Sequence, residues 1–305
     1  MLAYCAKRTI VALLVALTVS IISFALLHLS GDLAQSLAGP SATATDVAQV
    51  RKAYGLDRPI VVQYADWIAR AMRGDFGESF FLKVPVGELI ADRLPVTLTL
   101  GICALAFALA LSLPLGVAAA VRPNSWLDRL ALGLSVLGQA LPSFWFALIL
   151  IIVFGLKLRW LPVSGSGTWQ HFVLPAIALG YYATPAFMRL TRAGMLEALA
   201  SDYIRTARAK GLRTMSVLFK HALRNAIIPV VAVAAVQFGF MLGGSIVIES
   251  VFSLYGVGYL GWEAISRADF PVVQAIVLVL ASFYVVLTLL ADLLNAFLDP
   301  RVRVA

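Results

Sequence analysis

Six long stretches of the chain contain no Asp, Glu, Lys or Arg and consist mainly of apolar residues. They are residues 10–29, 94–121, 130–156, 172–188, 225–248 and 270–291. A helix needs about 20 predominantly apolar residues to cross the hydrocarbon core of a bilayer, and about 17 can suffice. Each stretch meets that length, so the pattern predicts an all-α integral membrane protein with six transmembrane helices.

The first apolar stretch follows Lys7 and Arg8, as the core of a secretory signal peptide would. Its 20 uncharged residues exceed the core of about 7 to 15 residues that such peptides carry. No small-x-small cleavage site follows directly. We therefore expect an uncleaved first helix.

Two short helices are predicted between the first and second spans. "ATDVAQVRKAYGLDRP" is typical of a helix that is closed by Gly55 and kept from continuing by Pro59. "IVVQYADWIARAMRGD" has apolar residues at helical spacing and stops at Gly74. We expect a small helical cap that packs over the outer rim of the bundle, with contact to an external receptor as the alternative.

The basic residues give the orientation. The formal net charge of +8 could suggest a nucleic-acid partner, but membrane proteins concentrate Lys and Arg on cytoplasmic loops. With the amino terminus inside and six crossings, the inside segments hold 14 basic residues and the two short outside loops hold three. The other seven lie in the long outside region, and long loops translocate largely regardless of charge. Both termini are expected in the cytoplasm, with membrane lipid and no nucleic acid as a partner.

This topology divides the chain into parts. The expected parts are a cytoplasmic N-terminus with the first helix (1–30), the outer cap (31–93), a transmembrane domain of five helices (94–298) that includes a cytoplasmic loop (193–225), and a cytoplasmic tail (299–305). Prolines 114, 142, 175 and 185 mark the spans. Prolines within a span free backbone carbonyls that neighbouring helices or cavity water must satisfy, which predicts kinked helices around a pathway.

Residue patterns for catalysis are missing from the sequence. There is no G-x-x-x-x-G-K-[ST] phosphate loop, so we do not expect the chain to bind and hydrolyse ATP by itself. His28, His171 and His221 are widely separated, and no H-E-x-x-H or G-x-S-x-G motif occurs. Cys5 and Cys103 have no CxxC or CxxH spacing and are expected to be inert packing residues without a disulfide or metal.

The predicted spans also hold almost no ionisable groups, since Glu249 and Asp292 lie at span ends. Ionisable residues at mid-membrane mark ion pathways and proton relays. Their absence favours a conduit that is moved by a partner. An ATP-independent channel or secondary transporter is the alternative from another class and predicts ionisable residues in the spans; a membrane enzyme would need a catalytic constellation.

The most charged segment is "SDYIRTARAKGLRTMSVLFKHALRNAIIP" (201–229), with six basic residues and one acid. Ser201 can cap a short helix, and Asp202 suits the positive end of its dipole. Gly211 is placed to end that helix in a left-handed conformation, and Thr214 can cap a second helix that runs into the fifth span. The prediction is a coupling element that transmits a push on the short helix into the membrane.

The same residues resemble a known family. "SDYIRTARAKG" followed by "KHALRNAIIPV" is similar to the cytoplasmic EAA loop of binding-protein-dependent ABC importer permeases, in its peptide-transporter form. The resemblance covers nearly the whole chain, to dipeptide, oligopeptide, glutathione and nickel permeases, through "YGLDRPIVVQY", "GDFGES", "RLPVTLTL", "LPSFW", "WLPVSG", "QFGFMLGGSIVIESVF", "ADFPVVQA" and "DLLNAFLDPRVR".

Three features depart from the family pattern. Of the general motif E-A-A-x-x-x-G only Ala207 and Gly211 match, and the family's proline usually lies nearer the glycine than Pro229 does. Both differences are typical of the peptide branch. In "FSLYGVGYL", Leu254 and Tyr255 stand where relatives usually carry Trp-Pro. That difference falls at the expected outer mouth of the pathway.

The resemblance implies a type I ABC importer permease fold in a bacterial cytoplasmic (inner) membrane and transport of a peptide or related small solute by alternating access. The implied partners are a second homologous permease, one or two ABC ATP-binding subunits that bind the ATP and Mg, and an external substrate-binding protein. No cofactor and no catalytic site are expected in this chain. Nickel chelate, glutathione or another non-peptide solute on the same scaffold is the alternative.

Site residues follow from the same resemblance. The short helix would sit in a cleft of an ATP-binding subunit, where basic side chains meet acceptors and Ala207 allows close approach. The expected coupling residues are Asp202, Arg205, Ala207, Arg208, Lys210 and Gly211. The alternative for each arginine is a positive-inside residue that faces water or lipid phosphate. On the fifth span Gln237, Gly243 and Ser245 are expected to line the pathway, with ordinary helix packing as the alternative for the small residues. Glu249 is expected to contact substrate or receptor, with a rim salt bridge as the alternative.

Overall fold

The computed structural model describes residues 2–29, 33–39 and 42–298, and the regular secondary structure in these ranges is helical. The predicted tail 299–305 and the predicted boundary after residue 30 lie outside them. The helices are α1 (Leu2–Leu29), α2 (Leu33–Ala38), α3 (Ala44–Ala53), α4 (Ile60–Ala71), α5 (Val86–Val121), α6 (Trp126–Ala140), α7 (Ser143–Leu150), η1 (Ile151–Lys157), η2 (Trp169–Phe172), α8 (Val173–Gly180), α9 (Thr184–Ala200), α10 (Asp202–Ala209), η3 (Ser216–Ala222), α11 (Leu223–Ala226), α12 (Ile228–Val251), α13 (Val257–Ser266) and α14 (Phe270–Leu298).

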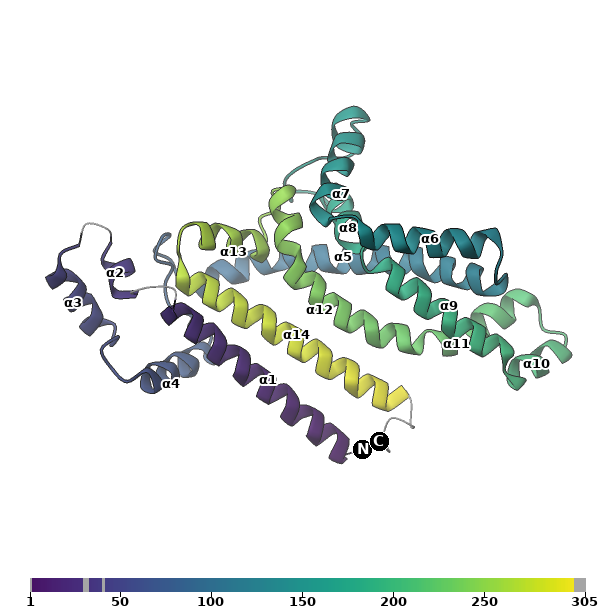
Figure 1. The fold of residues 1–305 in the computed structure, drawn as a ribbon, viewed down its shortest axis with the longest axis horizontal. Helices are drawn as coiled ribbons and strands as arrows, with labels where there is room; N and C mark the ends of the chain where they lie inside the picture. Colours follow the sequence, from purple (N-terminus) through teal and green to yellow (C-terminus); the bar gives the residue numbers. More distant parts are fainter. Residues whose placement is uncertain (1, 30–32, 40–41, 299–305) are drawn as a thin grey trace.

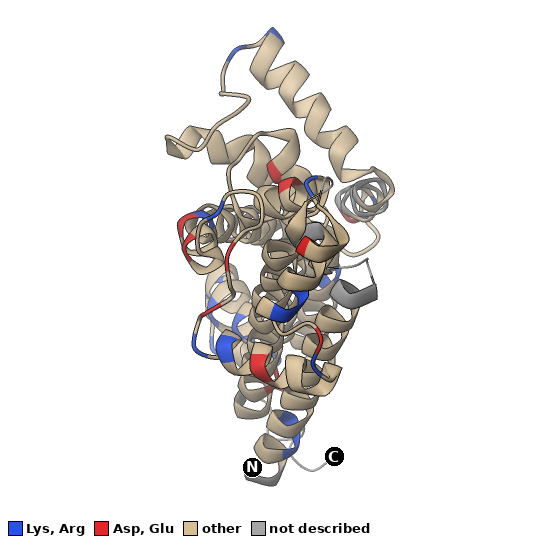
Figure 2. Cartoon of the chain, turned by 90° about the vertical axis from the view of Figure 1, so that its left-hand side faces the viewer, with Lys and Arg blue, Asp and Glu red and all other residues tan. Residues whose placement is uncertain are grey.

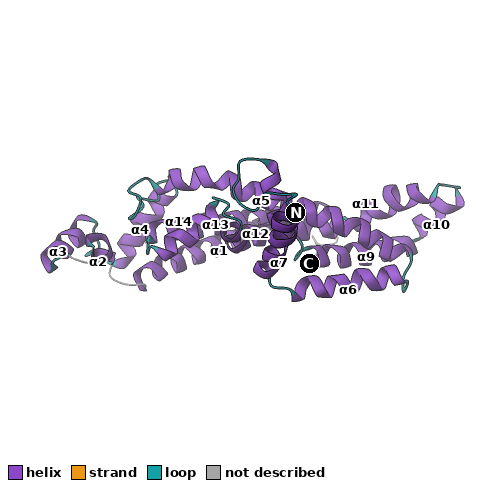
Figure 3. Cartoon of the chain, turned by 90° about the horizontal axis from the view of Figure 1, so that it is seen from above, coloured by secondary structure: helices purple, strands orange, loops and turns teal. Residues whose placement is uncertain are grey.

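The molecule is elongated, with the long helices lying side by side along its axis. Helices α2 and α3 lie at one end and α10 lies at the opposite end, in two perpendicular views (Figures 1 and 3). Coloured by charge, the long helices are mostly uncharged, and Lys, Arg, Asp and Glu gather in loops and near helix ends (Figure 2). This distribution suits a chain whose middle lies in hydrocarbon.

Four helices of the described residues are long and apolar enough to cross a membrane: Tyr4–Ala25, Val86–Val121, Ile228–Val251 and Phe270–Phe297. They confirm the first, second, fifth and sixth predicted spans. Helix α5 has 36 residues, which at about 1.5 Å per residue exceeds the hydrocarbon thickness of about 30 Å. Because α5 begins at Val86, the predicted boundary between cap and transmembrane domain at residue 94 falls inside one continuous helix.

The third and fourth predicted spans are each divided, whereas the hydrophobic pattern predicted one helix for each. Helix α6 ends at Ala140. The next residue, Leu141, has an extended backbone (φ −84°, ψ 130°), because the helical conformation is disfavoured for a residue that precedes a proline, here Pro142. Helix α8 ends at Gly180, and α9 starts at Thr184 with Pro185 in its first turn.

The two interruptions lie against each other. The Tyr181 hydroxyl donates a 2.5 Å hydrogen bond to the carbonyl oxygen of Leu141, and the Tyr181 and Phe146 rings lie 4.5 Å apart. A carbonyl freed at a proline break is thus satisfied by a neighbouring segment, as proline-interrupted spans require. At Gly180 a side chain would overlap the Ala104 carbonyl, so this glycine permits close packing of α8 on α5.

The two predicted cap helices are present as α3 and α4. Thr43 and Asp46 form a capping box at the start of α3, and the Thr43 hydrogen bonds hold the pKa of Asp46 below its usual value. Gly55 and Gly74 follow the two helices as predicted, and both have a left-handed backbone (φ 63° and 81°).

The hairpin that follows the cap is fixed to the loop between α13 and α14. The Asp269 carboxylate accepts hydrogen bonds from the Ser79 hydroxyl and from the backbone N–H groups of Phe80 (2.9 Å) and Phe81 (3.3 Å). The Arg267 guanidinium lies 3.8 Å from the centroid of the Phe81 ring. Two motifs far apart in sequence, "GDFGES" and "ADFPVVQA", therefore form one contact at the cap end of the bundle.

Candidate functional site

The segment 201–229 begins with a direct joint between two helices. Ser201 is both the C-cap of α9 and the N-cap of α10, with extended backbone angles (φ −75°, ψ 154°). Its hydroxyl donates to the Ala198 carbonyl at 2.5 Å and makes no cap bond to α10, so the predicted side-chain cap is wrong. Because no spacer separates the helices, a displacement of α10 acts directly on α9.

Gly211 ends α10 as predicted. Its φ is +76°, its N–H donates to Arg208 O at 2.9 Å, and the N–H of Leu212 donates to Ala207 O at 3.3 Å. This pair of bonds is the Schellman motif, which suits a glycine at the left-handed position. A Cβ placed at Gly211 would meet no atom within 4 Å, so the glycine is needed for backbone conformation and not for space.

Helix α10 has two different faces. Ile204 (0% exposed) and Ala207 (7% exposed) pack inward, in a cluster with residues of α5, α9, η3 and α11 such as Val117, Met195 and Val217. The small side chain of Ala207 therefore lets α10 approach the chain's own helices. A partner would meet the other face of α10.

That other face is exposed and charged. Asp202 and Arg205 form an ion pair at 3.2 Å in which both side chains are more than three-quarters exposed. Arg208, Lys210 and Gly211 are exposed beside it. Five of the six predicted coupling residues thus lie together on the surface.

A second helix joins α10 to the fifth span. Its helical residues start at Thr214, pass through the π-helical turn η3 and α11, and reach α12 after a turn at Ile227. The first backbone bond runs from Val217 N to Arg213 O at 3.1 Å, so the N-cap is Arg213, one residue before the predicted cap Thr214. Asn225 Nδ2 donates to Tyr203 Oη at 2.9 Å, which connects α10 to the start of the fifth span.

A buried ion pair connects α9 to α6. The Arg192 guanidinium donates from Nε to Asp128 Oδ1 and from Nη2 to Oδ2, both at 2.7 Å. Asp128 is 2% exposed and also accepts from the N–H of Asn124 at 2.9 Å. The guanidinium first, and then this N–H, hold the pKa of Asp128 below its usual value, so the carboxylate stays ionised at neutral pH.

The four predicted pathway residues do not share one face of α12. Gln237 is half-buried and Gly243 is exposed, and no atom lies within 4 Å of a Cβ at Gly243. Phe240 (61% exposed) lies on the same open side. Ser245 is fully buried, and its hydroxyl donates to Leu242 O at 2.9 Å within the helix.

Glu249 is enclosed by the chain itself, which does not fit the expected contact with substrate or receptor, and it forms no salt bridge with the residues that the structure describes. It is 0% exposed; Oε1 accepts from Thr97 Oγ1 and Oε2 from the N–H of Tyr259, both at 2.8 Å. Thr97 Oγ1 in turn accepts from the N–H of Val257 at 2.8 Å. Glu249 and Thr97 thus satisfy N–H groups of the first turn of α13, where a negative charge is stabilising.

The two residues that stand in place of the family's Trp-Pro, Leu254 and Tyr255, differ in their exposure. Leu254 is fully buried, whereas Tyr255 is 48% exposed. The Arg93 guanidinium lies 5.3 Å from the Tyr255 ring centroid and donates to the Tyr255 carbonyl at 3.3 Å. The Tyr255 ring and the Arg93 guanidinium therefore form an aromatic and cationic surface next to α13.

Sequence reasoning missed the residues that connect elements. The sequence marks Arg192 only as one of many basic residues. Ser125 and Asp128 stand before an apolar run and signal the start of a helix there, but they give no sign that Asp128 pairs with Arg192. Thr97 and Tyr203 gave no signal of their own, because their partners lie 152 and 22 residues away. Across the residues that the structure describes, no three His, Cys, Asp or Glu side chains are grouped to hold a metal ion.

The chain matches known proteins along its length. Residues 112–304 match the family described as "Binding-protein-dependent transport system inner membrane component", and residues 1–101 match the N-terminal part of the same membrane component. The glutathione transport system permease protein GsiC of Salmonella typhimurium (strain LT2) is 41% identical over 304 residues, 99% of either chain. GsiC of Escherichia coli (strain K12) is equally similar.

Solved structures support the same fold. Two crystal forms of the MetNI methionine ABC transporter in inward-facing conformations align with TM-scores of 0.54 and 0.57 at 18% and 20% identity, covering 69% of this chain and 96% of theirs. At this identity the likeness concerns the fold alone. The chain belongs to the family of binding-protein-dependent transport system inner membrane components and is a permease subunit of an ABC importer.

Proposed function

We propose that this permease takes up a short peptide or a peptide-like solute, with glutathione as the first substrate to test. The identity of 41% with glutathione permeases over the whole chain supports that choice, and other peptides or a nickel chelate are the alternatives on the same scaffold. An external binding protein delivers the solute, and the chain forms one half of the pathway beside a second homologous permease. It carries no catalytic site of its own.

The proposed topology places both termini in the cytoplasm of a bacterium, with residues 31–93 as the outer cap and residues 193–225 as the cytoplasmic loop. The excess of basic residues in the inside segments supports it. The position of α10 at the end opposite the cap is consistent with it (Figure 1).

Helix α10 docks in a cleft of an ABC ATP-binding subunit, which binds the ATP and Mg. The observation that carries this proposal is the exposed charged face of α10 on a helix that continues into α9 without a spacer. Arg208 and Lys210 meet acidic or carbonyl acceptors of that subunit, Asp202 and Arg205 shape the rim of the contact, and Gly211 fixes where the helix stops. Ala207 lets α10 pack on its own chain.

Along the pathway, Gln237 and Gly243 line the open side of α12. Ser245 and Glu249 support it from the buried side, Glu249 by holding α13 against α5 and α12. ATP binding and hydrolysis in the partner subunits move α10 and so switch access between the two sides of the membrane.

Purification of the tagged chain from its native membrane tests the proposal. We expect an ABC ATP-binding subunit and a second permease to co-purify, and the cognate binding protein to carry a peptide or glutathione when isolated. A chain that transports solute without any ATP-binding subunit would overturn the proposal. If the binding protein carries a nickel chelate, the proposed substrate would be wrong, whereas the proposed coupling through α10 would be unaffected.

A further inference from the structure

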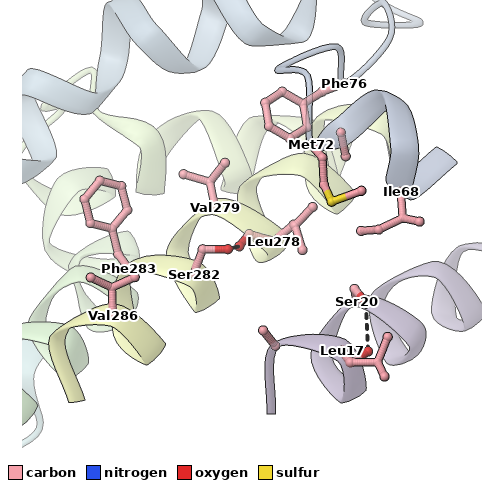
Figure 4. A pocket seen from close by; sticks show the side chains of 12 residues that line it. Leu17, Ser20, Ile68, Met72, Phe76, Leu278, Val279, Ser282, Phe283 and Val286 are labelled. Atoms are coloured by element: carbon pink, nitrogen blue, oxygen red, sulfur yellow. Dashed lines mark hydrogen bonds between the residues drawn. The ribbon is translucent and has the colours of Figure 1, made fainter. Parts of the chain in front are cut away.

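A groove of about 610 Å³ lies between α1, α14 and α4. Figure 4 shows Leu17 of α1 on one side, Leu278 and Phe283 of α14 on the other, and Met72 and Phe76 above them. The groove is separate from the open face of α12 and from α10.

The lining is almost entirely apolar. Its two hydroxyls are already bonded inside the protein, Ser20 Oγ to Leu17 O at 2.8 Å and Ser282 Oγ to Leu278 O at 2.7 Å. Ser20 also shares a 2.7 Å bond with the Tyr64 hydroxyl of α4. The other lining side chains are hydrocarbon, apart from the Met72 thioether, so the groove suits an alkyl chain.

Contacts on both sides of the groove hold α1 to α14. Arg8 pairs with Asp292 at 3.1 Å, and Ser23 Oγ donates to the Gln274 carbonyl at 3.5 Å. The α14 lining from Leu278 to Val286 is about 12 Å long at about 1.5 Å per residue, and its continuous apolar surface suits an extended alkyl chain.

The surroundings of the groove also suit a lipid, because it lies between membrane spans and next to aromatic and basic residues of α4. Both α1 and α14 are membrane spans by length and hydropathy, and the groove residues of both helices lie within those spans. Helix α4 packs on α1 through Tyr64 and Trp67, whose rings contact Phe24 and which are aromatic residues of the kind that favour the membrane interface. Arg70 and Arg73 are exposed at the end of α4, and no acid of the described residues lies within ion-pair distance of either.

We propose that this groove holds one acyl chain of a phospholipid from the leaflet next to the cap, with its phosphate near Arg70 and Arg73. The acyl chain completes the packing of α1, whose main contacts among the described residues are with α14 and α4. The proposal goes beyond the transport function and is independent of the substrate.

Photo-crosslinking tests it on the complete transporter in nanodiscs of phosphatidylethanolamine and phosphatidylglycerol, with a diazirine near the acyl terminus of the phosphatidylglycerol. We expect adducts to concentrate on residues 16–20 and 278–286 and to disappear in Ser282→Phe, which fills the groove. Thr18→Phe is the matched control, since Thr18 is exposed on α1 and does not line the groove; it should keep the adducts.

The headgroup is tested separately. Arg70→Gln and Arg73→Gln should each lower the preference for phosphatidylglycerol over phosphatidylethanolamine by roughly fivefold. Adducts spread evenly over the exposed faces of α1 would overturn the proposal. A disulfide between a cysteine introduced by Phe283→Cys and a cysteine on a helix of another subunit would also overturn it, because a protein would then occupy the groove.

Discussion

Arg192 on α9 holds Asp128 on α6 through two hydrogen bonds of 2.7 Å. Since α9 continues into α10 at Ser201, this pair connects the proposed docking helix to the third predicted span. The Asn225–Tyr203 bond connects the same helix to the fifth. A displacement of α10 therefore reaches two spans through two separate polar contacts.

Arg192→Ala should uncouple the transporter. Removal of the guanidinium leaves the buried Asp128 carboxylate unpaired, and such loss is strongly unfavourable. We expect substrate-stimulated ATPase activity of the complete transporter to fall several-fold while basal activity remains. Arg189→Ala, an exposed neighbour on the same helix, is the control; equal losses in both variants would argue against a role for this ion pair.

Substitutions at Gly211 separate conformation from space. Alanine meets no atom there, but the left-handed backbone costs a non-glycine residue about 1–2 kcal/mol, so Gly211→Ala should weaken coupling moderately. Gly211→Pro removes the N–H bonded to Arg208 O and forces a negative φ, so it should abolish stimulation. Western blots of membrane fractions should show normal insertion of both. Full stimulation in the proline variant would refute the proposed role of the helix stop.

Glu249 is predicted to act on stability and not on recognition. Glu249→Gln turns an amide donor toward the Thr97 hydroxyl or the Tyr259 N–H, which leaves a buried group unsatisfied at a cost of about 1–3 kcal/mol. The melting temperature of the purified complex should fall, and Thr97→Val should lower it similarly. Glu263→Gln is the control: it removes only a partly exposed ion pair with Arg267 and should change the melting temperature little. A Glu249→Gln complex with unchanged melting temperature and weaker substrate delivery would restore the direct-contact interpretation.

Larger side chains at two glycines of α12 should have different effects, on stability at Gly239 and on uptake at Gly243. At Gly239 a Cβ would lie 2.6 Å from Tyr284, so Gly239→Ala should destabilise the complex by overpacking, about 1–3 kcal/mol. At Gly243 nothing lies within 4 Å. Gly243→Phe should therefore leave the melting temperature unchanged and reduce uptake in proteoliposomes, and normal uptake would remove Gly243 from the pathway.

Much of the fold follows from local sequence. Uncharged runs located the four continuous spans, and the glycines at 55, 74 and 211 ended helices where they were expected to. The divided spans were harder to predict, because the apolar run at 130–156 continues unchanged through Pro142 and its break depends on the residue before the proline. Of the site, the exposed coupling face could be predicted from charge and capping signals.

Long-range partners could not be predicted. Ser245 and Glu249 are polar and lie near Gly243 in sequence, but both are buried, and Glu249 binds groups of α5 and α13 instead of facing the open side. A helical face can be read from the sequence, whereas the side on which another helix packs depends on tertiary contacts.

The most direct test of the account is the contact of α10 with an ATP-binding subunit. A photo-reactive amino acid at Arg208, in the complete transporter with Cys5 and Cys103 unchanged, should form an adduct with the ATP-binding subunit. The same amino acid at Tyr54, which is 63% exposed in the cap at the other end of the molecule, should form none. Adducts with that subunit from Tyr54 and none from Arg208 would contradict both the docking role and the orientation proposed here.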